Sequence, residues 1–241
     1  MLKQIGKTAL AMGIIMVFYF VAGASVVVNS LEGTQAKLSQ GIFIWLSVMA
    51  VVLFYLIRFR SIADLGFHKV REGSIRELLY LIPMLVIALL GLSGGVNFSY
   101  GGSFLFASLF LTIGVGLSEE IYFRGIICKL WMAHGSGKAI WISSILFGIC
   151  HLLNILGGAG VGATILQIFF AFFYGAILAV IFIRTQSIVP CILLHFLHDF
   201  CSFIAKDISQ IAQIGVGVTQ TLFLLFYLIF LVRNSKSKWE R

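Results

Sequence analysis

The stretch that decides the fold runs from Ser118 to Gly125 and reads SEEIYFRG, inside an apolar segment from 103 to 127. A bilayer core about 30 Å thick needs roughly 20 helical residues, so this segment is long enough to span it. A charged side chain near the bilayer centre costs roughly 2.5–3.5 kcal/mol on insertion scales. Glu119, Glu120 and Arg124 therefore mark a functional site inside a membrane helix.

Seven further apolar segments extend this interpretation to the whole chain. The chain has 241 residues, of which 60% are hydrophobic and 11% charged, whereas soluble domains carry about 25% charged residues. The sequence predicts an all-α polytopic membrane protein, a bundle of about eight transmembrane helices around a polar intramembrane cavity, in one domain over 1–241. The other seven predicted spans are 8–28, 41–57, 78–92, 139–156, 162–183, 187–205 and 211–232.

Basic residues are distributed unequally between the two sides that these spans define. With Arg124 left out, fourteen Lys and Arg residues fall on one side and only Lys37 and Lys206 on the other. The positive-inside rule then places both termini in the cytoplasm. The small loops suit the plasma membrane of a bacterial cell. Because the basic residues lie in short loops and tails, the net charge of +8 does not indicate a nucleic-acid partner.

Three other features are predicted to be structural. The apolar run 8–28 is longer than the usual 7–15 residues of a signal peptide's apolar core, so we expect a retained first helix. The loop from Arg58 to Glu77 mixes charged and apolar residues, which suits the membrane interface. The four cysteines lie in or beside apolar segments and lack CxxC spacing, so we expect small buried hydrophobes rather than disulfides or metal ligands.

Helical spacing separates the two glutamates. Glu120 and Arg124 are four residues apart and can form an ion pair on one helix face. Glu119 points about 100° away, which leaves its carboxylate free to act as a general base on water. The alternative is that both glutamates only neutralise Arg124 between helices.

Two further spans carry histidines. His151 lies in the sequence FGICHLLN, where Phe147 can pack on its imidazole and Asn154 can either hold it or bridge helices. His195 and Asp199 lie four apart on one face of the seventh span. His198 lies near that face, in a direct or a supporting role. Such a cluster can donate hydrogen bonds, shuttle protons or bind a metal.

Together, these three spans carry the polar groups that one reaction class needs. A glutamate beside a histidine can activate water, and a second histidine with a hydrogen-bonding neighbour can stabilise an oxyanion. These groups can hydrolyse a peptide bond without a covalent intermediate. The serine motif GxSxG and the zinc motif HExxH do not occur in the sequence.

The motifs EExxFRG, FGxxHLxN and HxxxD resemble those of the CAAX-protease and bacteriocin-processing (CPBP, or Abi) family of intramembrane proteases. The resemblance covers about 78–205 and rests on the order and spacing of the motifs. It implies an eight-helix bundle with a water-filled cavity, usually open to the cytoplasm. It also implies that Glu119 and His151 activate water, that Arg124 organises Glu119 and Glu120, and that His195 and the residue at 199 form the oxyanion site.

Asp199 departs from the family pattern, which often has Asn at this position. An ionised Asp accepts hydrogen bonds but cannot donate one to an oxyanion. Asp199 must then be protonated, orient a neighbouring histidine, or bind a metal. No cofactor is certain from the sequence. A divalent metal such as Zn²⁺ remains an option, and its candidate ligands are Glu119, His151, His195 and Asp199.

The leading hypothesis is an intramembrane endopeptidase that cleaves a hydrophobic, lipidated or membrane-associated peptide or protein. The alternative is a non-enzymatic bacteriocin immunity or interaction protein that uses the same polar core for binding. A third hypothesis, an ion-coupled transporter, also explains buried acidic residues and histidines. The sequence lacks the inverted repeat that many transporters contain, which disfavours it.

Overall fold

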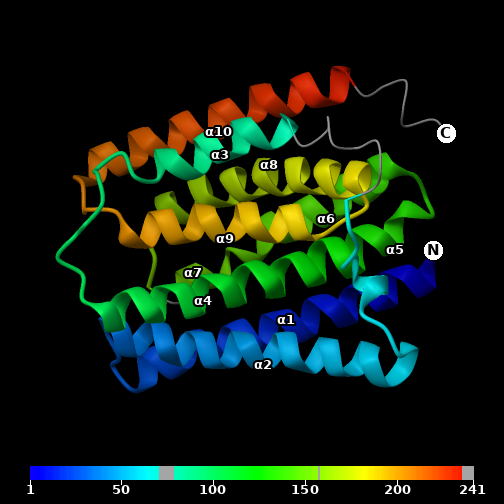
Figure 1. The fold of residues 1–241 in the computed structure, drawn as a ribbon, viewed down its shortest axis with the longest axis horizontal. Coiled ribbons are helices and arrows are strands. Elements are labelled where there is room, and N and C mark those ends of the chain that lie inside the picture. The colour runs from blue at the N-terminus through cyan, green and yellow to red at the C-terminus, as the bar shows by residue number, and fades with distance from the viewer. Residues whose placement is uncertain (71–78, 157, 235–241) are drawn as a thin grey trace.

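Long apolar helices run side by side along one axis of the molecule (Figure 1). The structure is a computed structural model that describes residues 1–70, 79–156 and 158–234. Its helices are α1 Leu2–Val28, α2 Gly33–Phe59, α3 Ile82–Leu90, α4 Gly102–Glu120, α5 Lys129–Met132, α6 Ser136–Cys150, α7 Leu153–Leu156, α8 Val161–Thr185, α9 Val189–Ile204 and α10 Gln210–Arg233, with a short 3-10 turn η1 Ala63–Leu65 and a π-helix η3 Ile121–Cys128.

These helices form the apolar segments that the sequence predicts. Six helical segments of the described chain are long and apolar enough to cross a membrane, and two shorter apolar helices accompany them at Leu79–Leu90 and Val189–Ile204. Together they coincide with the eight predicted spans. The protein is therefore an all-α, multi-pass membrane protein, as predicted. The start of α1 and the end of α10 lie at the same end of the bundle (Figure 1).

The two short helices, α3 and α9, pack against each other. With 16 residues, α9 is about 24 Å long, which is less than a bilayer core of about 30 Å. Beyond their ends the connecting segments pair in antiparallel fashion, since the Asn97 amide donates to the Ile204 carbonyl (2.8 Å) and the Lys206 amide donates to the Gly95 carbonyl (2.9 Å). This pairing satisfies backbone groups where the helices stop short.

Helix α4 lies between α2 and α9 and packs against both (Figure 1). Helix α4 closely approaches the backbone of α9 at Gly116. A Cβ atom there would lie 3.3 Å from the Ile192 carbonyl oxygen and 3.3 Å from the Phe196 amide nitrogen. The absence of a side chain at Gly116 lets the two backbones approach. The last turn of α4 is thereby brought beside the middle of α9.

The helix that begins as α4 changes its geometry directly after Glu120. Residues Ile121–Cys128 form the π-helix η3, and α5 then continues the same helical rod to Met132. A π-helix has a wider turn than an α-helix and occurs often at functional sites. Most of η3 is buried, including the aromatic side chains of Tyr122 and Phe123.

The described part of the loop after α2 docks on the end of the bundle. The Leu65 side chain is fully buried against the bundle. The Ser187 hydroxyl donates to the His68 carbonyl (2.6 Å), and the Ile188 amide donates to the Gly66 carbonyl (2.9 Å). These contacts hold the segment against the bundle. The remainder of the predicted interfacial loop, 71–77, lies outside the described residues.

The four cysteines are free thiols, as predicted. Cys128, Cys191 and Cys201 are buried, and Cys150 is half-buried. They pack as small apolar side chains within the bundle.

Candidate active site

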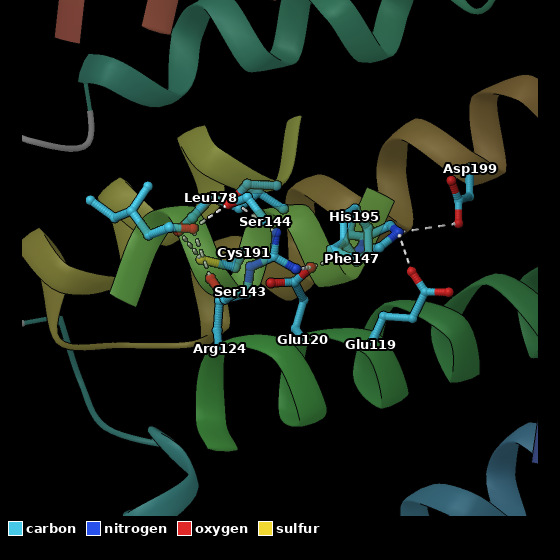
Figure 2. A network of polar contacts seen from close by, with 12 residues as sticks. Glu119, Glu120, Arg124, Ser143, Ser144, Phe147, Leu178, Cys191, His195 and Asp199 are labelled. Atoms are coloured by element: carbon cyan, nitrogen blue, oxygen red, sulfur yellow. Dashed lines mark hydrogen bonds and ion pairs between the residues drawn. The ribbon is translucent and has the colours of Figure 1, made fainter. Parts of the chain in front are cut away.

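The predicted polar residues come from three helices that meet inside the bundle. Glu119 and Glu120 are the last two residues of α4, while His195 lies near the middle of α9. His151 directly follows the last residue of α6, where the helix ends. Figure 2 shows the carboxylates of Glu119 and Asp199 directed at the imidazole of His195.

An ion pair between Glu120 and Arg124 lies at the base of the cluster. The Arg124 Nη1 donates to Glu120 Oε1 at 2.8 Å, and both side chains are at most 1% exposed. The same Oε1 lies 2.8 Å from His195 Nδ1. The predicted pair is thus present, and it has a third member that links α4 to α9. An oxygen that accepts from a guanidinium is that of an ionised carboxylate, so His195 Nδ1 carries the proton in this bond.

Arg124 also reaches α6 and α8. Its Nη2 donates to the Gly175 carbonyl at 2.9 Å, and its guanidinium lies 4.6 Å from the centre of the Phe147 ring. A Cβ atom at Gly175 would lie 3.0 Å from Nη2 and 2.8 Å from that ring, so no side chain fits there. Arg124 therefore joins three helices, which is a structural role for a buried cation.

The second nitrogen of His195 faces two carboxylates. Nε2 lies 3.5 Å from Glu119 Oε2 and 3.7 Å from Asp199 Oδ2 (Figure 2). Because ionised carboxylates only accept, a hydrogen bond to either of them needs a proton on Nε2. With that proton, His195 would carry two N–H groups and a positive charge and form ion pairs with both carboxylates. Together with Arg124 it offsets two of the three nearby carboxylates, which reduces the cost of burying them.

Glu119 contacts His195 directly, and its joint action with His151 stays a prediction. Among the described residues, His151 interacts with Glu119 electrostatically, without a hydrogen bond between them. The His151 Nδ1 lies 3.0 Å from the Phe147 carbonyl. A carbonyl only accepts, so Nδ1 is the protonated nitrogen. The Nε2 of a neutral His151 is then a hydrogen-bond acceptor.

Phe147 packs on His151, as the sequence suggests, and also on His195. The ring of Phe147 meets both imidazoles edge to face, at centroid distances of 5.3 Å for His151 and 5.8 Å for His195. The phenyl ring therefore fixes the orientation of both histidines. Of the two roles considered for Asn154, bridging is the one present, since its Nδ2 donates to Gln167 Oε1 on α8 (2.8 Å).

His198 supports the cluster from the side. Its Nδ1 lies 3.2 Å from Asp199 Oδ1, and its ring stacks on that of Phe170 at a centroid distance of 5.0 Å. Asp199 thus lies between His195 and His198, with one oxygen toward each. This arrangement fits a carboxylate that orients histidines.

A cavity of about 250 Å³ lies between α6, α8, α9 and α10 and is large enough for several water molecules. Four titratable residues that the sequence singled out line this cavity, namely His151, His195, His198 and Asp199. Glu119 does not line it. The cavity wall also contains residues, chiefly from α8, that no sequence motif indicated. The sequence of α8 is apolar with a single tyrosine, and such a pattern does not by itself indicate a functional residue. The side chains that matter most for the site are His151, His195, His198, Asp199, Phe170 and Tyr174.

The residues suggested as metal ligands do not converge on one point. Within the described chain, no three His, Cys, Asp or Glu side chains are placed to hold a metal ion together. The Nδ1 atoms of His151 and His195 are both engaged by protein oxygens. This donor arrangement does not fit a bound metal, and metal binding stays a prediction from the sequence.

A comparison with protein-family models matches residues 101–201 to the family described as type II CAAX prenyl endopeptidase Rce1-like. The matched segment contains all six predicted site residues and falls within the range of the resemblance. A comparison with curated proteins finds no match.

Proposed function

We propose that this chain, whose residues 101–201 match the family of Rce1-like type II CAAX prenyl endopeptidases, hydrolyses a peptide bond within the membrane by direct attack of water. The observation that carries this proposal is the position of His195. Glu120 binds its Nδ1 at 2.8 Å, while its Nε2 faces the Glu119 carboxylate at 3.5 Å. A general base and a cationic N–H donor are thereby placed side by side.

In the proposed reaction Glu119 accepts a proton from water as the water oxygen attacks the carbonyl carbon of the substrate. The carbonyl π electrons move to its oxygen, and the resulting oxyanion accepts a hydrogen bond from His195 Nε2–H. The C–N bond then breaks, and the protonated Glu119 returns its proton to the leaving nitrogen. No covalent intermediate with the enzyme forms.

The other site residues support these two. His151 accepts a hydrogen bond from the same water through Nε2, because its Nδ1–H is held by the Phe147 carbonyl. Glu120 and Arg124 hold His195 in its orientation and charge state. Asp199 accepts a hydrogen bond from His198 and forms an ion pair with His195 at 3.7 Å, so that its carboxylate keeps both rings in place.

The proposed substrate is a peptide or protein held at the membrane by a lipid or by its own apolar sequence. Two features favour this class: the family's described substrates are prenylated CAAX sequences, and the site lies within apolar helices. We propose that the protein lies in a bacterial plasma membrane with both termini in the cytoplasm.

Cleavage by the purified protein tests the proposal. The substrate is a farnesylated peptide that ends in a Cys-a-a-X sequence, and its unprenylated twin is tested beside it. We expect the wild type and Glu32→Ala, a control in the turn before α2, to release the last three residues, and Glu119→Ala to release none. Equal cleavage by wild type and Glu119→Ala would remove Glu119 from the mechanism. If no variant cleaves but Glu119→Gln cells remain protected from a peptide toxin, an immunity function is favoured instead.

A further inference from the structure

The oxyanion in the proposed reaction has one assigned hydrogen-bond donor, His195 Nε2–H. Oxyanion sites usually contain two donors, which hold the developing charge from two directions. The two carboxylates that face His195 Nε2, those of Glu119 and Asp199, only accept when ionised. A second donor must therefore come from another wall of the cavity.

Tyr174 on α8 lies in that wall. Its ring lies 5.9 Å from the ring of His195 and 5.3 Å from that of His198, and it lines the same cavity. The side chain is 2% exposed. Its hydroxyl is buried and has no hydrogen-bond partner among the described residues. A buried hydroxyl without a partner costs on the order of 1–3 kcal/mol, so it needs an explanation.

The rings around Tyr174 hold it in place. Phe170, one turn earlier on α8, stacks on it at 5.5 Å with an angle of 19° between the planes. Phe170 also stacks on His198, so Tyr174 and His198 pack on the same ring. A donor on such a rigid support needs little reorganisation during the reaction.

The other polar side chains of the cavity are already engaged or are farther along it. The Gln220 amide donates to the Ile87 carbonyl (3.0 Å), and the Ser202 hydroxyl donates to the His198 carbonyl (3.0 Å). Gln167 bonds Asn154 and precedes Tyr174 by seven residues, or about 10 Å along the helix. Among these side chains, Tyr174 is the one that combines proximity to His195 with a free O–H.

We propose that Tyr174 is a catalytic residue whose hydroxyl donates the second hydrogen bond to the oxyanion, opposite His195 Nε2–H. This inference rests on the proposed hydrolysis and assigns it a further residue. The phenol keeps its proton throughout, so its contribution is electrostatic and is largest in the transition state.

Tyr174→Phe tests the proposal because it removes the hydroxyl and keeps the ring. The matched control is Tyr122→Phe on η3, which is equally buried and whose hydroxyl accepts a weak bond from Ser47 (3.3 Å). With the farnesylated peptide we expect kcat to fall about 100-fold in Tyr174→Phe, with KM within about 3-fold of wild type. The control should keep the wild-type kcat.

Inhibitor binding gives a second readout that a loss of packing would not reproduce. A peptide aldehyde binds as a tetrahedral hydrate, whereas the matching peptide alcohol does not. Tyr174→Phe should weaken binding of the aldehyde by about the same factor by which it lowers kcat. Binding of the alcohol should stay unchanged. An unchanged kcat, or equal weakening of both inhibitors, overturns the role of Tyr174. Neither result affects the proposed hydrolysis, which fails separately if Glu119→Ala cleaves as the wild type does.

Discussion

The residue that organises the site is His195, which contacts three carboxylates from two helices. Glu120 binds one side of the imidazole, while Glu119 and Asp199 face the other. The two adjacent glutamates therefore have different surroundings, because they meet different nitrogens of one ring. Helical spacing predicted the pairing of Glu120 with Arg124. It could not predict the contact with His195, since that contact joins residues 75 positions apart in the sequence.

The burial of Arg124 leads to a stability prediction at the residue scale. Arg124→Met removes the partner of a fully buried carboxylate and should lower the free energy of unfolding by about 3–5 kcal/mol. Lys129→Met is the matched control, because Lys129 and Asp64 form an ion pair that is 44% and 61% exposed. Its expected cost is below about 1 kcal/mol.

Thermal unfolding of both variants in the same detergent measures this difference. If both variants lower the unfolding temperature by a similar small amount, the stability of the protein does not depend on the pairing of Glu120 with Arg124.

The geometry of the donors also predicts how the enzyme responds to chelators. Because the His, Asp and Glu side chains do not converge on a metal position, cleavage should continue at its normal rate in 1,10-phenanthroline or EDTA. Peptide cleavage is measured with and without the chelator, after metal analysis of the purified protein. A loss of activity that Zn²⁺ restores would contradict the water mechanism as proposed.

At the scale of elements, the site depends on how closely α4 approaches α9. Gly116 sets this distance, since a Cβ there would meet the backbone of α9 at 3.3 Å. Gly116→Val should separate Glu119 from His195 and lower kcat at least about 10-fold, because small misplacements of reacting groups are costly. The control is Gly13→Val on α1, where an added Cβ would meet no atom within 4 Å. This variant should keep its activity.

Peptide cleavage and thermal unfolding are measured together for these two variants. If Gly116→Val folds and cleaves normally, close packing of α4 on α9 is not needed for catalysis.

The helices themselves were largely predictable, and their irregularities were not. Apolar length identified all eight spans because bilayer thickness constrains it directly. The π-helix after Glu120 and the end of α6 next to His151 left no sign in the apolar pattern. These features depend on packing between helices, as does the position of Tyr174. The sequence therefore predicted which polar residues gather inside the bundle better than which of them touch.

At the scale of the whole molecule, the distribution of basic residues predicts orientation. The loop between α3 and α4 should face outward and the turn between α5 and α6 should face the cytoplasm. We expect a membrane-impermeant maleimide to label Ser99→Cys in intact cells and Ala133→Cys only after lysis. Both positions are exposed, and the half-buried Cys150 is replaced by Ser to remove background.

Labelling of the two variants in the opposite order would invert the predicted topology. It would also place the substrate on the outer side, since the whole bundle would be reversed.

The central claim is that Glu119 activates water and does not hold the substrate. The most direct measurement determines peptide affinity and cleavage rate together for purified wild type and Glu119→Gln, which keeps the shape of the side chain. We predict that Glu119→Gln binds the farnesylated peptide with wild-type affinity and cleaves it at least about 100-fold more slowly. Cleavage by Glu119→Gln at the wild-type rate would contradict the claim.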